Sequence, residues 1–61
     1  MQKLKECRTK KGYSIRELSE KSNVAYSYIS ELENGNKENP SKKVMDKLAE
    51  ALNVTVSEIF Y

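Results

Sequence analysis

The sequence of 61 residues predicts an all-α fold in which five short helices form one compact domain over residues 1–61. Three observations support this prediction. Apolar residues recur at helical spacing in short runs, capping sequences begin several of these runs, and glycine or asparagine follows most of them. The chain contains no internal repeat and no low-complexity segment. A domain this small buries only about 60% of its unfolded surface, so its core is expected to be modest.

The first helix is predicted over residues 2–11. Leu4 and Cys7 fall at its inward positions, and lysine and glutamate side chains occupy the outward ones. Gly12 ends the helix, as is common just past a C-cap. Because Cys7 is the only cysteine, a disulfide framework is excluded, and a small buried side chain is its simplest interpretation.

Two further helices, at about 15–21 and 26–33, form a helix-turn-helix candidate. Ser14 and Glu17 begin the first as an S-x-x-E capping box, in which each side chain binds a backbone N–H of the other residue. Asn23 stands at the sharp turn, because asparagine tolerates the left-handed conformation. The inward set of the second helix is Val24, Ile29 and Leu32.

The last two helices are predicted at about 42–51 and after Thr55. Ser41 is the expected N-cap of the longer one, and Thr55 with Glu58 repeats the capping-box pattern for the shorter one. The inward side chains expected in the longer helix are Val44, Leu48, Ala49 and either Met45 or Leu52.

The net charge of +2 is too small to identify a nucleic-acid-binding protein, but the charge is unevenly distributed. Residues 1–23 hold seven Lys or Arg against three Glu, and residues 24–61 hold four Lys against six acidic residues. Such asymmetry favours a side that faces a polyanion. A solvated helix face is the simpler explanation of the charge when it is considered alone.

Catalysis, cofactors and metal binding are not expected. The sequence has no histidine, no glycine-rich phosphate loop and no cluster of carboxylates, so no catalytic constellation is apparent. No run approaches the roughly 20 apolar residues of a membrane span, and the start lacks the apolar core of a signal peptide. These features predict a cytoplasmic protein that is not an enzyme and has no small-molecule effector.

A set of residues spread over nearly the whole chain resembles one known family. These residues are Lys11-Gly12-Tyr13-Ser14, Glu17-Leu18-Ser19-Glu20-Lys21, Val24, Ser27-Tyr28-Ile29-Ser30, Leu32-Glu33-Asn34-Gly35, Asn39-Pro40-Ser41 and Leu48-Ala49-x-Ala51-Leu52-Asn53-Val54. The pattern is similar to the Cro/repressor family of XRE-type, lambda repressor-like DNA-binding domains, with the helix-turn-helix at about 15–33. Its most specific part is the Ile-Ser-x-Leu-Glu-Asn-Gly run after the turn.

The resemblance implies a sequence-specific regulator of transcription that binds double-stranded DNA. In this family the second helix of the motif enters the major groove, and a homodimer binds a two-fold operator. The family also implies repression, and a nucleoid-associated protein of a prokaryote or phage. The alternative is a protein–protein interaction module that kept the fold but lost specific DNA binding.

The family pattern assigns base contacts to three side chains on the second helix of the motif. Tyr26 can stack on a thymine methyl group or reach a phosphate, Ser27 can bond to several bases, and Glu31 can accept from the N4 amine of cytosine. The alternative for all three is an ordinary exposed helix face. The phosphate contacts expected by resemblance are Ser14, Arg16, Tyr28, Asn34, Asn36 and Lys37.

Two further pairings follow from the resemblance. Arg8 is expected to form a structural ion pair with Glu33, which would hold the first helix to the end of the third. A dimer contact is expected at the last turn, although its residues could instead simply close the core. The residues concerned are Val56, Ile59, Phe60 and Tyr61.

Four positions depart from the family pattern. Ala25 stands where Ser or Thr usually caps the third helix, which costs about 1 kcal/mol of helix stability. Ile15 replaces a glutamine that commonly bonds to phosphate or to a base-reading side chain, and it is expected to pack beside Tyr26 or Tyr28. Glu31 and Tyr26 stand where Arg or Gln is frequent, so the DNA sequence that is read is expected to differ.

Overall fold

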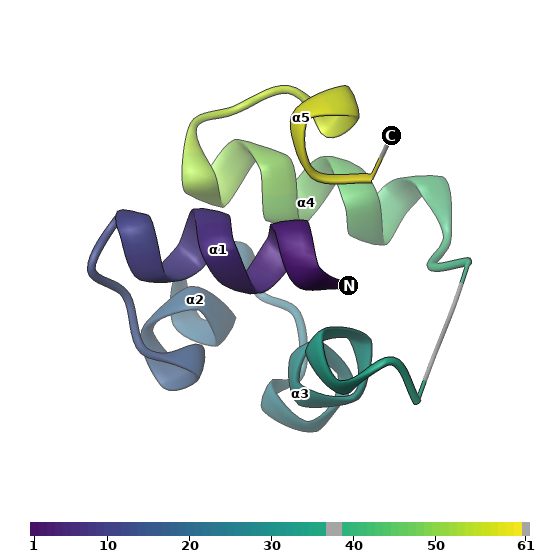
Figure 1. The fold of residues 1–61 in the computed structure, drawn as a ribbon. Helices are drawn as coiled ribbons and strands as arrows, with labels where there is room; N and C mark the ends of the chain where they lie inside the picture. The colour runs from purple at the N-terminus through teal and green to yellow at the C-terminus, as the bar shows by residue number, and fades with distance from the viewer. Residues whose placement is uncertain (37–38, 61) are drawn as a thin grey trace.

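The computed structural model describes residues 1–36 and 39–60, and within these ranges it is entirely helical (Figure 1). The five predicted helices are confirmed, with boundaries that shift by only a residue or two. They are α1 (Gln2–Lys10), α2 (Ile15–Ser22), α3 (Tyr26–Asn34), α4 (Lys42–Leu52) and α5 (Val56–Phe60).

The helix ends lie where the capping residues predict them. After α1, Gly12 adopts a φ of +80°, and its N–H donates to the carbonyl oxygen of Thr9 at 2.9 Å. Ser41 caps α4 by accepting from the N–H of Val44 at 3.2 Å. At α5, the N–H of Thr55 donates to the Glu58 carboxylate at 2.7 Å, and the N–H of Glu58 donates to Thr55 Oγ1 at 3.3 Å. Both halves of the second predicted capping box are therefore present.

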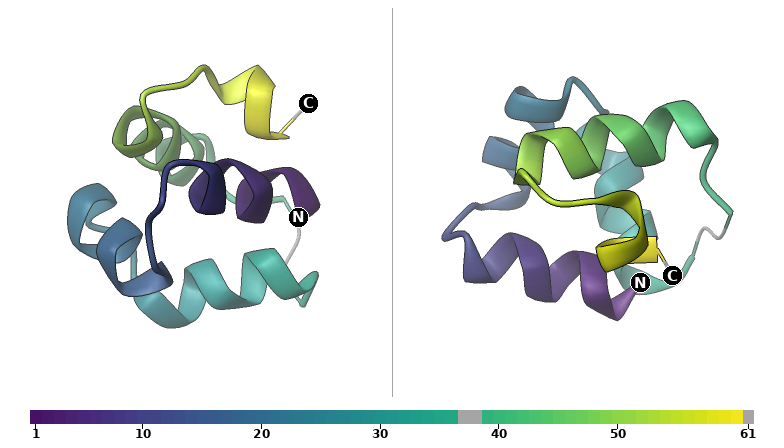
Figure 2. Two further views of the ribbon diagram at one scale, coloured as in Figure 1. Left: turned by 60° about the vertical axis from the view of Figure 1, so that its left-hand side comes forward. Right: turned by 90° about the horizontal axis from the view of Figure 1, so that it is seen from above.

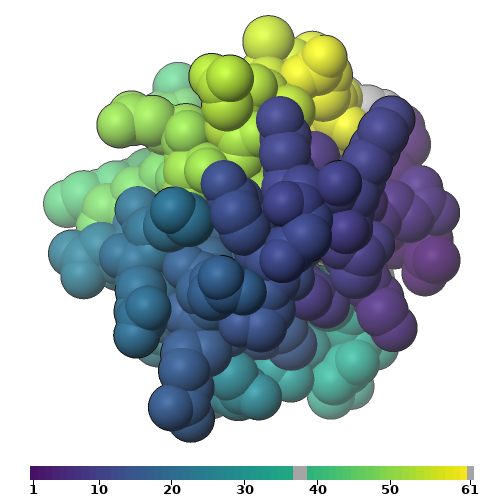
Figure 3. Space-filling view, turned by 90° about the vertical axis from the view of Figure 1, so that its left-hand side faces the viewer, coloured from purple at the N-terminus to yellow at the C-terminus, as the bar shows by residue number. Residues whose placement is uncertain are grey.

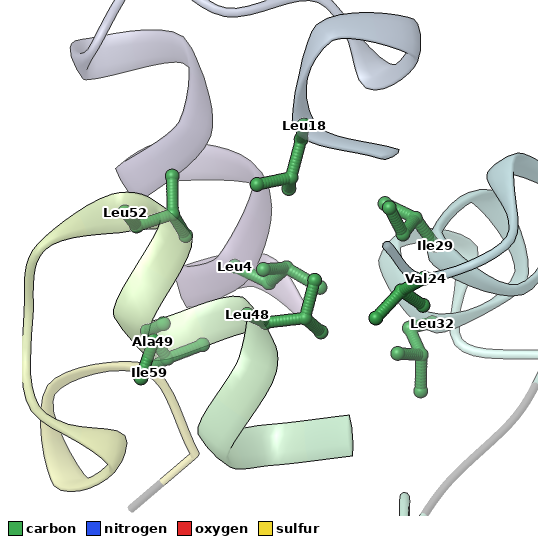
Figure 4. Close-up of a cluster of buried hydrophobic side chains, with 9 residues drawn as sticks. All are labelled: Leu4, Leu18, Val24, Ile29, Leu32, Leu48, Ala49, Leu52 and Ile59. Carbon is green, nitrogen blue, oxygen red and sulfur yellow. The ribbon is translucent and has the colours of Figure 1, made fainter. Parts of the chain in front are cut away.

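The core draws at least one buried side chain from each helix (Figure 4). Leu52 is fully buried and Met45 only half-buried, so Leu52 is the inward residue at the end of α4. Cys7 is half-buried against the core rather than inside it. Burial of each large core side chain contributes roughly 1.5–3 kcal/mol. The buried apolar residues are Leu4, Leu18, Val24, Ile29, Leu32, Leu48, Ala49, Leu52 and Ile59.

The helices are arranged so that α3 and α5 lie on opposite sides of α1 (Figures 1 and 2). Helix α1 packs against both of them, and α2 packs against α3 and α4. The outer face of α3 is therefore left uncovered by the other helices. Within the described ranges, no helix has the length and apolarity needed to cross a membrane, and no group of three His, Cys, Asp or Glu side chains could hold a metal ion.

Candidate nucleic-acid interface

The start of α2 is held by the predicted capping box. The N–H of Ser14 donates to Glu17 Oε1 at 2.9 Å, and the N–H of Glu17 donates to Ser14 Oγ at 3.0 Å. The hydrogen bonds that the backbone N–H and the side chain of Ser14 make to the Glu17 carboxyl lower the pKa of this group, because they favour its charged form. Ser14 is exposed, so its side chain is accessible to an incoming group.

The turn between α2 and α3 is fixed by one backbone conformation and two side-chain bonds. Asn23 adopts the left-handed conformation, with φ 60° and ψ 30°. Ser19 Oγ donates to the carbonyl oxygen of Val24 at 2.6 Å, and Ser22 Oγ accepts from the N–H of Val24 at 3.2 Å. Both hydroxyls bond to the backbone of Val24, just before α3, and so tie the turn to α2.

The predicted ion pair between Arg8 and Glu33 is confirmed, and it anchors the far end of α3. Arg8 Nε and Nη2 donate to the two carboxylate oxygens of Glu33 at 2.6 and 2.9 Å, and Arg8 Nη1 donates to the carbonyl oxygen of Tyr13 at 2.7 Å. Both charged groups are nearly buried, and the bonds to Glu33 raise the pKa of the Arg8 guanidinium. The amino group of Met1 adds a bond to the carbonyl oxygen of Leu32.

The three predicted base-contacting residues lie on the outer side of α3, though not equally exposed. Tyr26 and Ser27, at the first two positions of the helix, are exposed, and 53% of Tyr26 is accessible to solvent. Glu31, just over a turn further on, is half-buried. The N-terminal turn of α3 therefore projects most, which is the part that meets base edges in helix-turn-helix domains.

The predicted phosphate contacts flank this helix at both ends. Ser14 and Arg16 are exposed at the start of α2, where the first N–H groups of a helix have no partner within it. Asn34 and Asn36 are exposed at the end of α3, and the N–H of Asn36 donates to the carbonyl oxygen of Glu31 at 2.9 Å. Tyr28 is half-buried on α3, and Lys37 lies outside the described residues.

A hollow of about 360 Å³ beside the start of α3 brings in one residue that was not among the predicted DNA contacts. It is lined by Arg16, Ser19, Glu20 and Tyr26, so Glu20 adds a carboxylate to the interface. The spacing of four residues between Arg16 and Glu20 puts them on one face of α2, and this spacing could have indicated Glu20.

The departures at Ala25 and Ile15 have visible structural effects. Ala25 occupies the N-cap position of α3 and makes no side-chain capping bond. Its backbone conformation, with φ −56° and ψ 138°, is close to polyproline II. Ile15 is half-buried and packs against the core, so it occupies an apolar site instead of reaching outward. Compared with the family pattern, the interface therefore lacks one polar side chain at the start of α2 and one at the start of α3.

The residues of the predicted dimer contact divide into two groups. Ile59 is only 2% exposed and belongs to the core, so a second copy of the chain cannot reach its side chain. Val56 and Phe60 are half-buried at the surface of α5, and Tyr61 lies outside the described residues. The dimer contact therefore stays a prediction, now resting on Val56 and Phe60.

Helices α2 and α3 are short and are joined at Asn23, which has the left-handed conformation. The inner side of α3 packs on the rest of the fold and its outer side is uncovered. This arrangement defines the class of helix-turn-helix domains. A family model described as Helix-turn-helix matches residues 4–59, nearly the whole chain. The chain belongs to the XRE-type, Cro/repressor-like helix-turn-helix family.

Two transcriptional regulators of this family are similar in sequence to most of this chain. The HTH-type transcriptional regulator SinR of Bacillus subtilis is 44% identical over 55 residues, which cover 90% of this chain and 50% of SinR. The HTH-type transcriptional regulator SlrR of the same organism is 42% identical over 53 residues, which cover 87% of this chain and 35% of SlrR. The chain thus spans about half the length of SinR, and less of SlrR.

Solved structures give the same result. The crystal structure of SinR, the master regulator for biofilm formation, in complex with DNA has a TM-score of 0.94 and 40% identity, covering 98% of this chain and 95% of that chain. The N-terminal DNA-binding domain of SinR from Bacillus subtilis has a TM-score of 0.93 and 40% identity, covering 98% and 87%. The lambda repressor-like fold expected from the sequence is therefore confirmed.

Proposed function

We propose that this chain binds double-stranded DNA sequence-specifically and regulates transcription, acting as a repressor at a two-fold operator. Helix α3 enters the major groove and directs Tyr26, Ser27 and Glu31 toward base edges. Ser14, Arg16, Asn34 and Asn36 bind the phosphates on either side, with Tyr28 and Lys37 as further phosphate contacts. Acting on chromosomal or phage DNA would put the protein in the cytoplasm.

The observation that carries this proposal is the way α3 is presented. Its outer side is not covered by other helices, and Tyr26 and Ser27 are exposed there. The Arg8–Glu33 pair and the hydrogen bonds at Val24 hold the helix to the rest of the fold. A rigid helix with a polar front can dock without a large loss of conformational freedom. Similarity to a SinR domain whose crystal structure contains DNA supports the same mode of binding.

Binding as a homodimer follows from the small reach of one α3. A single helix contacts only a few base pairs, so two copies on a two-fold site are needed for useful specificity. The half-sites would then lie about 34–36 Å apart, one helical turn of DNA. Val56 and Phe60 of α5 are the surface through which the two copies would touch.

The test is selection of binding sites from a random duplex DNA pool in about 0.1 M salt, followed by sequencing. Enrichment of a two-fold-related motif supports operator recognition and gives the half-site spacing. Arg16→Ala should weaken all DNA sequences alike, whereas Tyr26→Ala should change the preferred base at one position. Lys10→Ala is the matched control, because it removes a positive charge at the end of α1 that is not among the proposed DNA contacts.

A protein-binding module is the second candidate, because two carboxylates lie at this interface. Glu31 on α3 and Glu20 beside Tyr26 both oppose phosphate. The salt dependence of DNA affinity separates the two functions, since a DNA-binding protein loses affinity steeply as salt displaces its phosphate contacts. Absence of any enriched motif, with no binding even at low salt, would favour the second candidate.

A further inference from the structure

A groove of about 450 Å³ runs along α1 on the side of α5, apart from the interface described above. One wall is a single stripe of α1, made by residues that repeat at helical spacing. The opposite wall consists of Val54, in the turn before α5, and Glu58 of α5. We name this feature the α1–α5 groove. Its α1 stripe consists of Lys3, Glu6, Cys7, Lys10 and Lys11.

The charge of the groove is concentrated at one end. The turn between α4 and α5 lies beside the C-terminal end of α1, and α5 lies beside its N-terminal half (Figures 1 and 2). The first end therefore holds Lys10, Lys11 and Val54, while the other holds Lys3 with Glu6 and Glu58. Figure 3 looks onto the first end, where the side chains at the end of α1, in dark blue, lie next to the yellow-green turn.

This end of the groove carries two exposed lysines. Among the residues that the structure describes, neither Lys10 nor Lys11 forms an ion pair. Two half-buried apolar side chains, Cys7 and Val54, pack on the core beside them. This end of the groove thus combines two exposed positive charges with an apolar floor, which is the complement of an anionic group next to an apolar side chain.

The groove also lies away from α3. Helix α1 separates α5 from α3 (Figure 2), so the α1–α5 groove lies on the other side of α1 from α3, the helix that carries the exposed residues Tyr26 and Ser27. A ligand in the groove would not cover the outer face of α3. Both surfaces can therefore be occupied at the same time.

We propose that the α1–α5 groove binds an acidic peptide segment of a partner protein, with an apolar side chain on Cys7 and Val54 and carboxylates at Lys10 and Lys11. A second nucleic acid is the less suitable ligand, because its backbone offers no apolar side chain, and Glu6 and Glu58 would repel its phosphates. A peptide can place its carboxylates at one end only, and so avoid these two glutamates. This inference does not depend on DNA binding by α3.

The test uses the full chain, labelled with ¹⁵N, and a synthetic amphipathic peptide of about 12 residues with leucine and glutamate at helical spacing. Amide chemical shifts are followed as the peptide is added without DNA. The largest changes are expected around Cys7, Lys10, Lys11 and Val54. The same peptide with lysine in place of glutamate, and one with alanine in place of leucine, should each bind at least about tenfold more weakly.

Matched variants of the protein locate the binding site. Lys10→Glu reverses a charge inside the groove, and Lys5→Glu reverses the same charge on an exposed position of α1 outside it. Lys10→Glu is expected to weaken peptide binding about tenfold and Lys5→Glu by less than about twofold. Because both side chains are exposed, both variants should keep the fold, and the dispersion of the amide spectrum checks this.

Three results would overturn the proposal: no shift changes at millimolar peptide, changes centred on α3 or α4, or equal weakening by Lys10→Glu and Lys5→Glu. Failure of the operator selection is a separate result, because the peptide is measured without DNA. If an enriched operator is found, adding it at saturation should leave peptide affinity within about twofold of its value without DNA.

Discussion

The guanidinium of Arg8 on α1 and the carboxylate of Glu33 on α3, 25 residues apart in the sequence, are joined by two hydrogen bonds of 2.6 and 2.9 Å. The third bond of Arg8, to the Tyr13 carbonyl oxygen, ties in the loop before α2. One side chain thus connects α1, the start of the helix-turn-helix and the end of α3. The pair sets the position of α3 relative to α1, on which the proposed interface depends.

Breaking this pair should destabilise the protein strongly. Arg8→Ala leaves the Glu33 carboxylate buried without its partner, since only 3% of the Glu33 side chain is exposed, and should lower the free energy of unfolding by about 3–5 kcal/mol. Urea denaturation followed by circular dichroism measures it. The double variant Arg8→Met with Glu33→Leu should recover most of the loss, because no charge is left buried. A loss below about 1 kcal/mol in Arg8→Ala would contradict this account.

Restoring the missing cap of α3 should stabilise the fold. Ala25→Ser supplies a hydroxyl that can accept from the free N–H groups of the first turn, and should raise the free energy of unfolding by about 1 kcal/mol. Ser41→Ala, which removes an existing cap from α4, should lower it by a similar amount and serves as the reference. Urea titration of both variants gives the comparison. No gain in Ala25→Ser would mean that water already satisfies these groups.

The Ser14–Glu17 capping box predicts a dependence of stability on acid. The pKa of Glu17 is lower in the folded chain than its ordinary value of 4.5, so the stabilisation is complete above pH 4.5 and is lost as the pH falls through the lowered pKa. Glu17→Gln keeps a capping side chain that does not titrate. Its free energy of unfolding should therefore fall less than that of the parent between about pH 5 and pH 3. If the free energies of unfolding of the two proteins fall in parallel over this pH range, Glu17 is not the source of the acid dependence.

Removing the charge of Glu31 should change which base α3 prefers. Glu31→Gln replaces a cytosine acceptor by an amide suited to adenine, so one operator position should change by about 1–3 kcal/mol of discrimination. Binding-site selection with the variant measures this. Glu20→Gln removes an equal charge in the hollow beside Tyr26, and is expected to raise affinity without changing base preference. An unchanged motif in Glu31→Gln would remove Glu31 from the base-contacting set.

Dimer formation on DNA should depend on Phe60. Phe60→Ala is expected to reduce cooperative binding to a duplex with two half-sites, because Phe60 is a half-buried apolar side chain on α5. Affinity for a duplex with a single half-site should stay the same, which provides the internal control. Gel-shift titration of the two duplexes measures the cooperativity on two half-sites and the affinity for one half-site. Equal cooperativity in parent and variant would exclude α5 as the contact between copies.

Features set by short-range sequence were predictable. The two capping boxes, the turn at Asn23 and the helix end at Gly12 depend on residues within four positions of one another. The Arg8–Glu33 pair is long-range, and it was expected only because the family pattern contains it. The base-contacting set rests on that pattern too, and its exposure is now known, although its contacts to DNA stay predictions.

The rest depends on packing, which a single sequence does not specify. Periodicity marked Ile59 as apolar but could not decide between the core and a second copy of the chain. The α1–α5 groove was not predicted, because Lys10 and Val54 become neighbours only when the turn before α5 folds onto α1. The bond from Met1 to the Leu32 carbonyl oxygen likewise joins parts of the chain that share no local pattern.

The shortness of the helices has a consequence for how the protein unfolds. The longest described helix, α4, has 11 residues, and isolated helices shorter than about 12–15 residues are marginal in water. None of the helices can therefore persist once the shared core separates. The helical circular dichroism signal should disappear in one transition together with any probe of tertiary packing, and a chain that loses α5 should lose its helical signal as a whole.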